Sequence, residues 1–407
     1  MSTQPAGSDR DVPEPARTAS EPARQAPRQR FPDQLRGLAL LGIIVVNAPF
    51  MAISIDGFTE ASTSTALDRI AAFATTLIAE GKFYILFSFL FGYSANFIVK
   101  QGEPASRRRW KRRLIGLAVI GLSHAIFLFI GDILFAYAIL GFGLMLMFSR
   151  QDRTVLMTGA ISALVGIVWL AALVFLAAAF PEELASDPTI ESLDVALASG
   201  SFLGAAEARL EALPLLLLTL GSLQWPLAFA SFCVGLVAGR HRFLADLGSR
   251  RGTWKRMAFW GLAVGIPIQL AATWLVYREG VALGTGFESM LGLAIILATA
   301  PILSAGYVGA LALLSLNRPR ILATIQDSGR ASLTIYIGES FVLSLLFCGW
   351  GFGLFGQLGA AAVTAVAVLT WIALVVVMHL WLGRFRQGPL ETLMARWTGK
   401  AGGSAAG

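Results

Sequence analysis

Three ionisable side chains lie inside long apolar stretches of this chain, namely His124, Asp132 and Glu339. Ionisable groups in such surroundings are costly and mark functional sites by default. Histidine suits a general base or a proton relay, because its pKa lies near neutrality. His124 lies about 16 Å from the N-terminal end of its stretch, at about 1.5 Å per residue. We predict a buried catalytic site, with a neutral histidine hydrogen-bonded to a neighbouring helix as the alternative.

Asp132 follows His124 by eight residues and comes directly after Gly131, where we expect a tight helical hairpin. On an unbroken helix the two side chains would lie about 12 Å apart and on different faces. Helix geometry alone therefore predicts no hydrogen-bonded pair. Asp132 is predicted to cap the next helix, to take part in the site, or both.

Glu339 belongs to a polar stripe in another apolar stretch. The stripe consists of Ser332, Tyr336, Glu339 and Ser340; Tyr336 lies four residues after Ser332, and Glu339 and Ser340 lie three and four residues after Tyr336, which places the four on one helix face. Glu339 lies about 13 Å inside its stretch, deeper than any other carboxyl group. The stripe is predicted to bind substrate and Glu339 to act as an acid or base; the alternative is a polar seam between helices.

Lys82 and Ser88 belong to the aromatic run GKFYILFSFLFG at residues 81–92. Lys82 is one of four basic residues that the charge pattern described below does not explain. Both side chains are predicted to contact substrate. For Lys82 the alternative is a side chain that extends to the membrane surface.

Asp33, Arg36 and Asn47 lie at and beyond the start of the first apolar stretch. Arginine presents a planar fork of donors that suits phosphate. These three residues are predicted to form a phosphate or nucleotide contact. The alternative is a local ion pair between Asp33 and Arg36, which are one helical turn apart.

Composition predicts an all-α membrane protein. Hydrophobic residues make up 56% of the 407 residues and charged residues only 14%, too few charges to cover a soluble protein of this size. Several apolar runs reach the ~20 residues that cross a bilayer. We predict a bundle of about ten transmembrane helices, at residues 35–55, 82–99, 114–130, 132–149, 154–180, 213–238, 257–277, 289–316, 331–350 and 359–383. Residues 65–79 are predicted to form an amphipathic helix before the second span.

Basic residues concentrate in alternate loops and at both ends. Of the 32 Lys and Arg residues, 28 fall there, and the exceptions are Arg69, Lys82, Arg209 and Arg278. Basic loops stay in the cytoplasm, so both termini are predicted to be cytoplasmic. We call the two faces the predicted inner and outer sides. The positive charge thus reflects membrane topology and contact with lipid headgroups, and predicts no nucleic-acid partner.

Residues 31–399 are predicted to form one polytopic domain with an external loop at 181–212. Residues 1–30, rich in Pro, Arg, Ala and Glu, are predicted to be a disordered cytoplasmic tail, and 400–407 a flexible end. Cys233 and Cys348 lie in predicted spans and show no metal-binding spacing, so we expect core packing. No metal and no bound cofactor are predicted.

Five runs, in order along residues 31–399, resemble the YeiB-like family of bacterial membrane proteins. They are DQLRGLALLGI at 33–43 followed by Asn47, the run at 81–92, His124 followed by GDIL at 131–134 and Tyr137-Ala138, GRASLTIY at 329–336, and GPLE at 388–391 followed by Arg396 and Thr398. This family is similar, more distantly, to the transmembrane acyltransferases. The resemblance implies a bacterial inner-membrane protein that transfers an acyl group from cytoplasmic acyl-CoA.

In that interpretation Asp33 and Arg36 hold the donor, while His124 and Asp132 serve the acceptor, which is a small molecule, a sugar or a lipid. Direct transfer and a transient acyl-histidine are both open. A second hypothesis is a proton-coupled transporter or flippase of an amphipathic molecule, with His124 and Glu339 as the relay. A third is a noncatalytic membrane partner that binds through its external acidic loop. A homodimer is left open.

Overall fold

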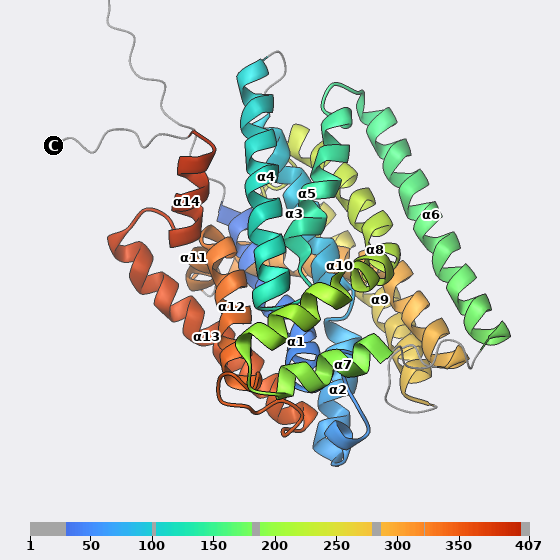
Figure 1. Ribbon diagram of the computed structural model, residues 1–407. Helices are drawn as coiled ribbons and strands as arrows, with labels where there is room; N and C mark the ends of the chain where they lie inside the picture. The colour runs from blue at the N-terminus through green and yellow to red at the C-terminus, as the bar shows by residue number, and fades with distance from the viewer. Residues whose placement is uncertain (1–29, 100–102, 181–187, 279–285, 321, 400–407) are drawn as a thin grey trace, which may run out of the picture.

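The computed structural model describes residues 30–99, 103–180, 188–278, 286–320 and 322–399, and no strand occurs among them. The α-helices are α1 (Arg30–Ala52), α2 (Ala66–Ile78), α3 (Lys82–Ile98), α4 (Pro104–Phe127), α5 (Ile133–Leu144), α6 (Asp152–Ala179), α7 (Pro188–Ala198), α8 (Phe202–Arg240), α9 (Arg251–Arg278), α10 (Phe287–Asn317), α11 (Ala323–Arg330), α12 (Ser332–Phe347), α13 (Ala360–Arg384) and α14 (Pro389–Trp397). Short 3₁₀ turns precede α2 (Ala61–Thr63) and extend α5 (Met145–Met147). Figure 1 shows the long helices gathered into one bundle.

The chain is a multi-pass membrane protein, as predicted. Among the described residues, seven helices are long and apolar enough to cross a bilayer, or eight if the bent pair α11 and α12 counts as one span. All ten predicted stretches are helical, but α4 and α5 fall short of this criterion. The first half of α4 carries the basic residues 107–113, and α5 has only 12 residues. The prediction of ten spans is therefore confirmed only in part.

Small residues let α3 and α8 approach closely. A Cβ atom at Gly235 would lie 2.0 Å from the carbonyl oxygen of Phe89, and one at Gly92 would lie 2.1 Å from that of Phe232. Both distances are far below van der Waals contact, and backbone atoms cannot move aside. Membrane helices lack a strong hydrophobic drive to associate, so close backbone contact of this kind holds them together.

A sharp bend of 86° separates α11 from α12. Glu391 of α14 caps the start of α12: its Oε1 accepts hydrogen bonds from the N–H groups of Leu333 (2.7 Å) and Thr334 (3.2 Å), and its Oε2 accepts one from the Thr334 hydroxyl (2.6 Å). A carboxylate satisfies the free N–H groups at a helix N-terminus and complements the helix dipole. The cap fixes where α12 begins, and α12 carries Tyr336 and Glu339.

The helix α7 lies across the end of the bundle, close to where α4 ends (Figure 1). Asp194 attaches it to the turn after α1, because its carboxylate accepts hydrogen bonds from the Ser54 hydroxyl (2.6 Å) and the Ile55 N–H (2.8 Å). The N–H of Gly349 also donates to the carbonyl oxygen of Leu197 (2.9 Å). These bonds tie α7 to two other parts of the chain.

The described part of the predicted external loop, residues 188–212, is mostly helical. Besides α7, it contains the start of α8, which begins eleven residues before the predicted span 213–238. The cause is local, since the Ser201 hydroxyl accepts a hydrogen bond from the Gly204 N–H (3.1 Å) and caps the helix early. The predicted helix at 65–79 is present as α2. The predicted tails lie outside the described residues, except for Arg30, which begins α1.

Gly235→Ala should destabilise the protein, because its new methyl group meets the Phe89 carbonyl oxygen in a contact that cannot relax. We expect a loss of about 1–3 kcal/mol in the free energy of unfolding, seen as a lower melting temperature in nanodiscs. Gly383→Ala is the matched control, since nothing lies within 4 Å of a Cβ atom there. Equal melting temperatures for the two variants would contradict the close contact.

Asp194 should make the attachment of α7 pH-dependent. Burial, and then the nearby Asp56 carboxylate, raise the pKa of Asp194 above its ordinary value. A carboxyl group with a raised pKa stabilises the folded state fully below its ordinary pKa of about 3.9. That contribution is lost as the pH rises through the raised pKa. Asp194→Asn should therefore gain stability relative to the native protein between pH 4 and pH 7.

The measurement is the difference in melting temperature between Asp194→Asn and the native protein at each pH. Glu191→Gln is the control, because Glu191 is an exposed carboxyl group on the same helix. A difference for Asp194→Asn that does not change with pH would show that this carboxyl group does not govern the docking of α7.

Candidate functional site

His124 and Asp132 form a hydrogen-bonded pair at the tip of the α4–α5 hairpin. Their atoms Nδ1 and Oδ2 lie 2.8 Å apart, and each side chain is 1% exposed. Helix geometry alone predicted no such pair, and the pair forms here because no continuous helix joins the two residues. The helix α4 ends at Phe127 and α5 begins at Ile133, so the intervening loop returns Asp132 to the side of α4. We call this pair the dyad.

Gly121 makes room for the dyad. It lies one turn before His124 on α4, and a Cβ atom there would lie 2.6 Å from the Oδ1 atom of Asp132 and 2.4 Å from the Phe135 N–H nitrogen. The predicted capping role of Asp132 is confirmed, because Oδ1 accepts a hydrogen bond from Phe135 N–H at 2.7 Å. One carboxylate therefore both begins α5 and holds the imidazole ring.

The helix α12 packs against this tip. The Tyr336 hydroxyl accepts a hydrogen bond from Ile133 N–H (3.2 Å) and lies 3.4 Å from Asp132 Oδ2, toward which it donates a long, weak hydrogen bond. The Tyr336 and His124 rings lie 5.0 Å apart between centroids. Two turns further along α12, the Ser344 hydroxyl donates to the Leu128 carbonyl oxygen (2.9 Å). The dyad therefore rests on contacts from both α5 and α12.

Two polar atoms at this site are buried without a hydrogen-bond partner among the described residues. They are Nε2 of His124 and Oε1 of Glu339, and both residues are 2% exposed. Glu339 lies one turn beyond Tyr336 on α12. With Asp132 accepting from Nδ1–H, the tautomer that fits the contacts leaves a lone pair on Nε2. An imidazole held in this way can take a proton from a bound hydroxyl or amine.

Lys82 and Ser88 have partners outside the dyad. Lys82 is 0% exposed, and its ammonium group donates to the Thr76 carbonyl oxygen at 2.9 Å, so it does not extend to the membrane surface. The Ser88 hydroxyl lies 2.7 Å from the Tyr137 hydroxyl and thus joins α3 to α5. Ser332 is half-buried at the first residue of α12. For all three side chains, contact with substrate stays a prediction.

The residues predicted to hold a donor lie elsewhere. Arg36 forms an ion pair with Asp33 (2.6 Å) and also donates to the Ser94 hydroxyl of α3. Asn47 lies eleven residues further along α1, about 16 Å from Arg36 at 1.5 Å per residue. The structure therefore separates Asn47 from the Asp33–Arg36 pair.

Arg113 of α4 adds a second cation near this pair, since it interacts electrostatically with Arg36 and Glu391. Its guanidinium lies over the Phe91 ring, 6.0 Å from the centroid, and its Nε atom is buried without a partner among the described residues. Arg36 and Arg113 together offer a place for an anion at the predicted inner side. No group of three or more His, Cys, Asp or Glu residues is arranged for a metal ion within the described part of the chain.

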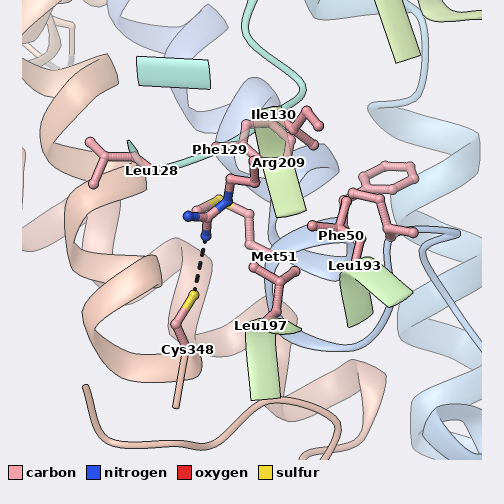
Figure 2. A pocket seen from close by; sticks show the side chains of 10 residues that line it. Phe50, Met51, Leu128, Phe129, Ile130, Leu193, Leu197, Arg209 and Cys348 are labelled. Carbon is pink, nitrogen blue, oxygen red and sulfur yellow. Dashed lines mark hydrogen bonds between the residues drawn. The ribbon is translucent and has the colours of Figure 1, made fainter. Parts of the chain in front are cut away.

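A small cavity lies beside the hairpin tip. Its volume is only about 10 Å³, room for about one water molecule. Figure 2 shows the Arg209 side chain among apolar side chains of the cavity, with its guanidinium directed at Cys348. The residues of the cavity wall are Phe50, Met51, Ile55, Leu128, Phe129, Ile130, Leu193, Leu197, Arg209 and Cys348. Phe129 also meets the His124 ring edge-on, with 6.4 Å between ring centroids.

Sequence reasoning missed Gly121, Glu391 and Arg209 as parts of this arrangement. A glycine one turn from a buried histidine is a signal for close approach that was available. Arg209 was also marked, as one of the few basic residues on the predicted outer side. Nothing in the sequence pointed to Glu391 as a cap, because its partner helix begins 59 residues earlier.

Asp132→Ala should cost more stability than the loss of a helix cap alone. The cap contributes about 1 kcal/mol, and His124 would be left buried with neither ring nitrogen paired, at a further cost of about 1–3 kcal/mol. Ser201→Ala is the control that removes only a cap, and Asp132→Asn should lie between the two. The measurement is thermal unfolding in nanodiscs. Equal losses for Asp132→Ala and Ser201→Ala would mean that the dyad does not stabilise the fold.

Comparison with known proteins shows a match to a family over the C-terminal part and distant relatives over most of the chain. Residues 238–401 match the family described as "Protein of unknown function (DUF418)". Over 391 residues the chain is 29% identical to "Uncharacterized protein YxaH" of Bacillus subtilis (strain 168), an alignment that covers 89% of this chain and 92% of the relative.

It is 27% identical over 387 residues to "Uncharacterized protein YeiB" of Escherichia coli (strain K12), covering 92% of this chain and 97% of the relative. An "Uncharacterized 39.9 kDa protein in amylase 3'region" of Bacillus acidopullulyticus is 27% identical over 376 residues, covering 88% of this chain and 90% of the relative. The predicted similarity to YeiB is thus confirmed. The chain is a multi-pass membrane protein, distantly homologous to YeiB and YxaH over nearly its full length, with a DUF418 match across its C-terminal part.

Proposed function

We propose that this protein is an integral membrane acyltransferase that moves an acyl group from an acyl-CoA donor to a hydroxyl or amine of a small molecule, sugar or lipid. The observation that carries the proposal is the buried dyad, in which Asp132 holds one imidazole nitrogen of His124 and the other, Nε2, has no partner among the described residues. A histidine fixed by a carboxylate is the arrangement that general-base catalysis of acyl transfer requires.

In the proposed reaction, Nε2 of His124 removes the proton from the acceptor hydroxyl or amine as that group attacks the thioester carbonyl carbon. A new C–O or C–N bond forms, the C–S bond breaks, and the proton passes from Nε2 to the departing sulfur. The products are the acylated acceptor and free CoA. Asp132 stabilises the transient imidazolium and keeps the ring in position. Glu339, whose Oε1 atom is buried without a partner among the described residues, would hold the acceptor.

The donor would bind from the predicted inner side. Arg36 and Arg113 lie there, next to the run of basic residues at the start of α4. Guanidinium groups suit phosphates, and CoA carries several. Arg113 precedes His124 by eleven residues on one helix, which corresponds to about 16 Å. The long flexible arm between the phosphates and the thioester of an acyl-CoA suits such a separation.

The test is release of free CoA by purified protein in nanodiscs, supplied with acetyl-CoA or longer acyl-CoAs and a panel of hydroxyl and amine acceptors. His124→Asn should slow release by about 10²–10⁴-fold, because asparagine cannot accept the proton. His379→Asn is the matched control, since His379 also pairs with an aspartate through Nδ1 (2.8 Å) but is exposed. Full activity in His124→Asn would exclude the proposed base.

Donor binding can be measured without an acceptor, because a ligand of the folded state raises the melting temperature. Acyl-CoA should raise it in the native protein and in His124→Asn, but not in Arg36→Ala. Arg330→Ala is the control, since Arg330 forms the same three-residue-spaced ion pair, with Asp327 (3.0 Å). The proton-coupled transporter would be favoured instead if acyl-CoA neither binds nor releases CoA, and if the protein in vesicles moves an amphipathic molecule across the membrane.

A further inference from the structure

A break in a membrane span places Lys82 near the middle of the membrane. Residues Ala66–Ile98 together are apolar enough to form one span of 33 residues, and Lys82 lies at its centre. The Lys82 carbonyl oxygen accepts a hydrogen bond from the Ser304 hydroxyl (2.9 Å). Ser304 is itself deep in α10, about 26 Å from one end and about 20 Å from the other at about 1.5 Å per residue. An ionisable side chain at that depth is costly and marks a functional site by default.

The break itself holds the Lys82 ammonium group. Gly81, which precedes α3, has a φ of 80°, in the left-handed region that favours glycine. The N–H group of Glu80 donates to the Thr75 carbonyl oxygen (3.2 Å), which leaves the Thr76 carbonyl oxygen to accept a hydrogen bond from Nζ of Lys82 (2.9 Å). An ammonium group has three donors, and among the described residues this is its one hydrogen bond. Lys82 is also 0% exposed.

Glu80 carries the opposite charge but does not touch Lys82. Its carboxyl group interacts electrostatically with Lys82, Tyr84 and Tyr277, yet it makes no hydrogen bond or direct ion pair among the described residues. Tyr307 of α10 also faces the end of α2, but tyrosines are neutral at pH 7 and add no charge. Direct contact is what offsets the cost of burying two charges. Without it, the uncharged forms of the two groups, an acid and an amine, are favoured.

A polar face of α9 leads from the predicted outer side toward the break. Gln269, Thr273 and Tyr277 follow one another at intervals of four residues and therefore share one face. The Tyr277 hydroxyl lies 2.9 Å from the Thr76 hydroxyl of α2. The Oε1 atom of Gln269 and the Thr273 hydroxyl are buried without a hydrogen-bond partner among the described residues. Unpaired acceptors of this kind can bind a water molecule or a proton in transit.

The deeper end of this polar face reaches the break. Nε2 of Gln269 donates to the Ile296 carbonyl oxygen (3.0 Å) and the Thr299 hydroxyl (2.8 Å) of α10. The side chain of Ile296 lies 3.8 Å from the place of a Cβ atom at Gly81. Gln269 and Gly81 thus approach the same residue of α10. A proton is the ligand that suits this closely packed place, because it needs no cavity of its own.

We propose that Glu80 and Lys82 form a proton-binding site in the middle of the membrane, which exchanges its proton with the predicted outer side along this face of α9. The Lys82 ammonium gives one proton to a carboxylate oxygen of Glu80, so the site holds an amine and a carboxylic acid with no net charge. Release of the acid proton to water leaves a carboxylate, and a proton from the outer side restores the acid. The proposal does not rest on acyl transfer, since the dyad lies on other helices.

The test is infrared spectroscopy of the full-length protein in nanodiscs at pH 7, where an ordinary glutamate is ionised. The native spectrum minus that of Glu80→Gln should contain the carbonyl band of a carboxylic acid. Glu288→Gln is the matched control: Glu288 pairs directly with Arg278 (3.0 Å), so its difference spectrum should contain carboxylate bands only. Carboxylate bands alone in the Glu80 difference spectrum would overturn the proposal, because Glu80 would then be the fixed counter-charge of Lys82.

Exchange of the proton is followed by transfer of the sample into D₂O, which shifts the carboxylic acid band. The Glu80 band should shift in the native protein, and Thr273→Val should slow the shift several-fold. Thr364→Val is the control, since the Thr364 hydroxyl is also buried without a partner among the described residues but lies on α13. A Glu80 band that never shifts, or one that shifts equally fast in Thr273→Val, would overturn the proposal.

A double variant keeps the test possible if Glu80→Gln fails to fold. Glu80→Gln combined with Lys82→Met removes both ionisable groups, and replacing a buried charged pair by neutral side chains is often neutral or stabilising. The native spectrum minus that of the double variant should contain the same carboxylic acid band, and its absence would overturn the proposal. An exchangeable Glu80 proton without CoA release would leave this inference standing and remove only the acyltransferase proposal.

Discussion

A single buried carboxylate determines the geometry at the centre of this protein. Asp132 caps α5 through one oxygen and holds His124 through the other, while the Tyr336 hydroxyl lies next to it. In a site from which water is excluded, each of these polar groups would otherwise remain unsatisfied at considerable cost. The carboxylate therefore decides the course of the hairpin, the orientation of the imidazole ring and the position of α12 relative to both. The Asp132 carboxylate therefore determines both the shape of the hairpin and the orientation of His124.

The helix α12 links the dyad with the cavity beside Arg209. Its first turn is held by Glu391, its middle faces the dyad through Tyr336, and just past its end Cys348 meets Arg209. A helix is stiff over this length, so its capped start sets the position of every later residue. The dyad and the cavity therefore both contact α12 or the residue that follows it. Polar contacts at the start, in the middle and beyond the end of α12 help to fix where this helix lies.

The sequence predicted the helical class and the approximate positions of the ten apolar helices, and it singled out His124, Asp132 and Tyr336, which the structure brings together. Those predictions rest on hydropathy and on the rarity of charge in apolar runs, which single residues report directly. The His124–Asp132 bond was not predicted, because it depends on where α4 ends and how residues 128–131 turn. Loop conformation depends on packing against α12, and a helix-spacing argument contains no such information. Arg209 was noticed only as an exception to charge asymmetry, since its neighbours come from distant segments.

The separation of Tyr336 from Asp132 by 204 residues has a consequence for biosynthesis. A ribosome that adds about 5–20 residues per second needs roughly 10–40 s to pass from one to the other. During that interval α4 and α5, which individually fall short of a spanning helix, must reside in or near the bilayer with His124 and Asp132 close to the tip of their hairpin. Because Asp132 pairs with Nδ1 of His124, the hairpin contains this hydrogen bond by itself and can insert as a unit. The order of translation thereby allows the dyad to form first and the helix that completes it to arrive later.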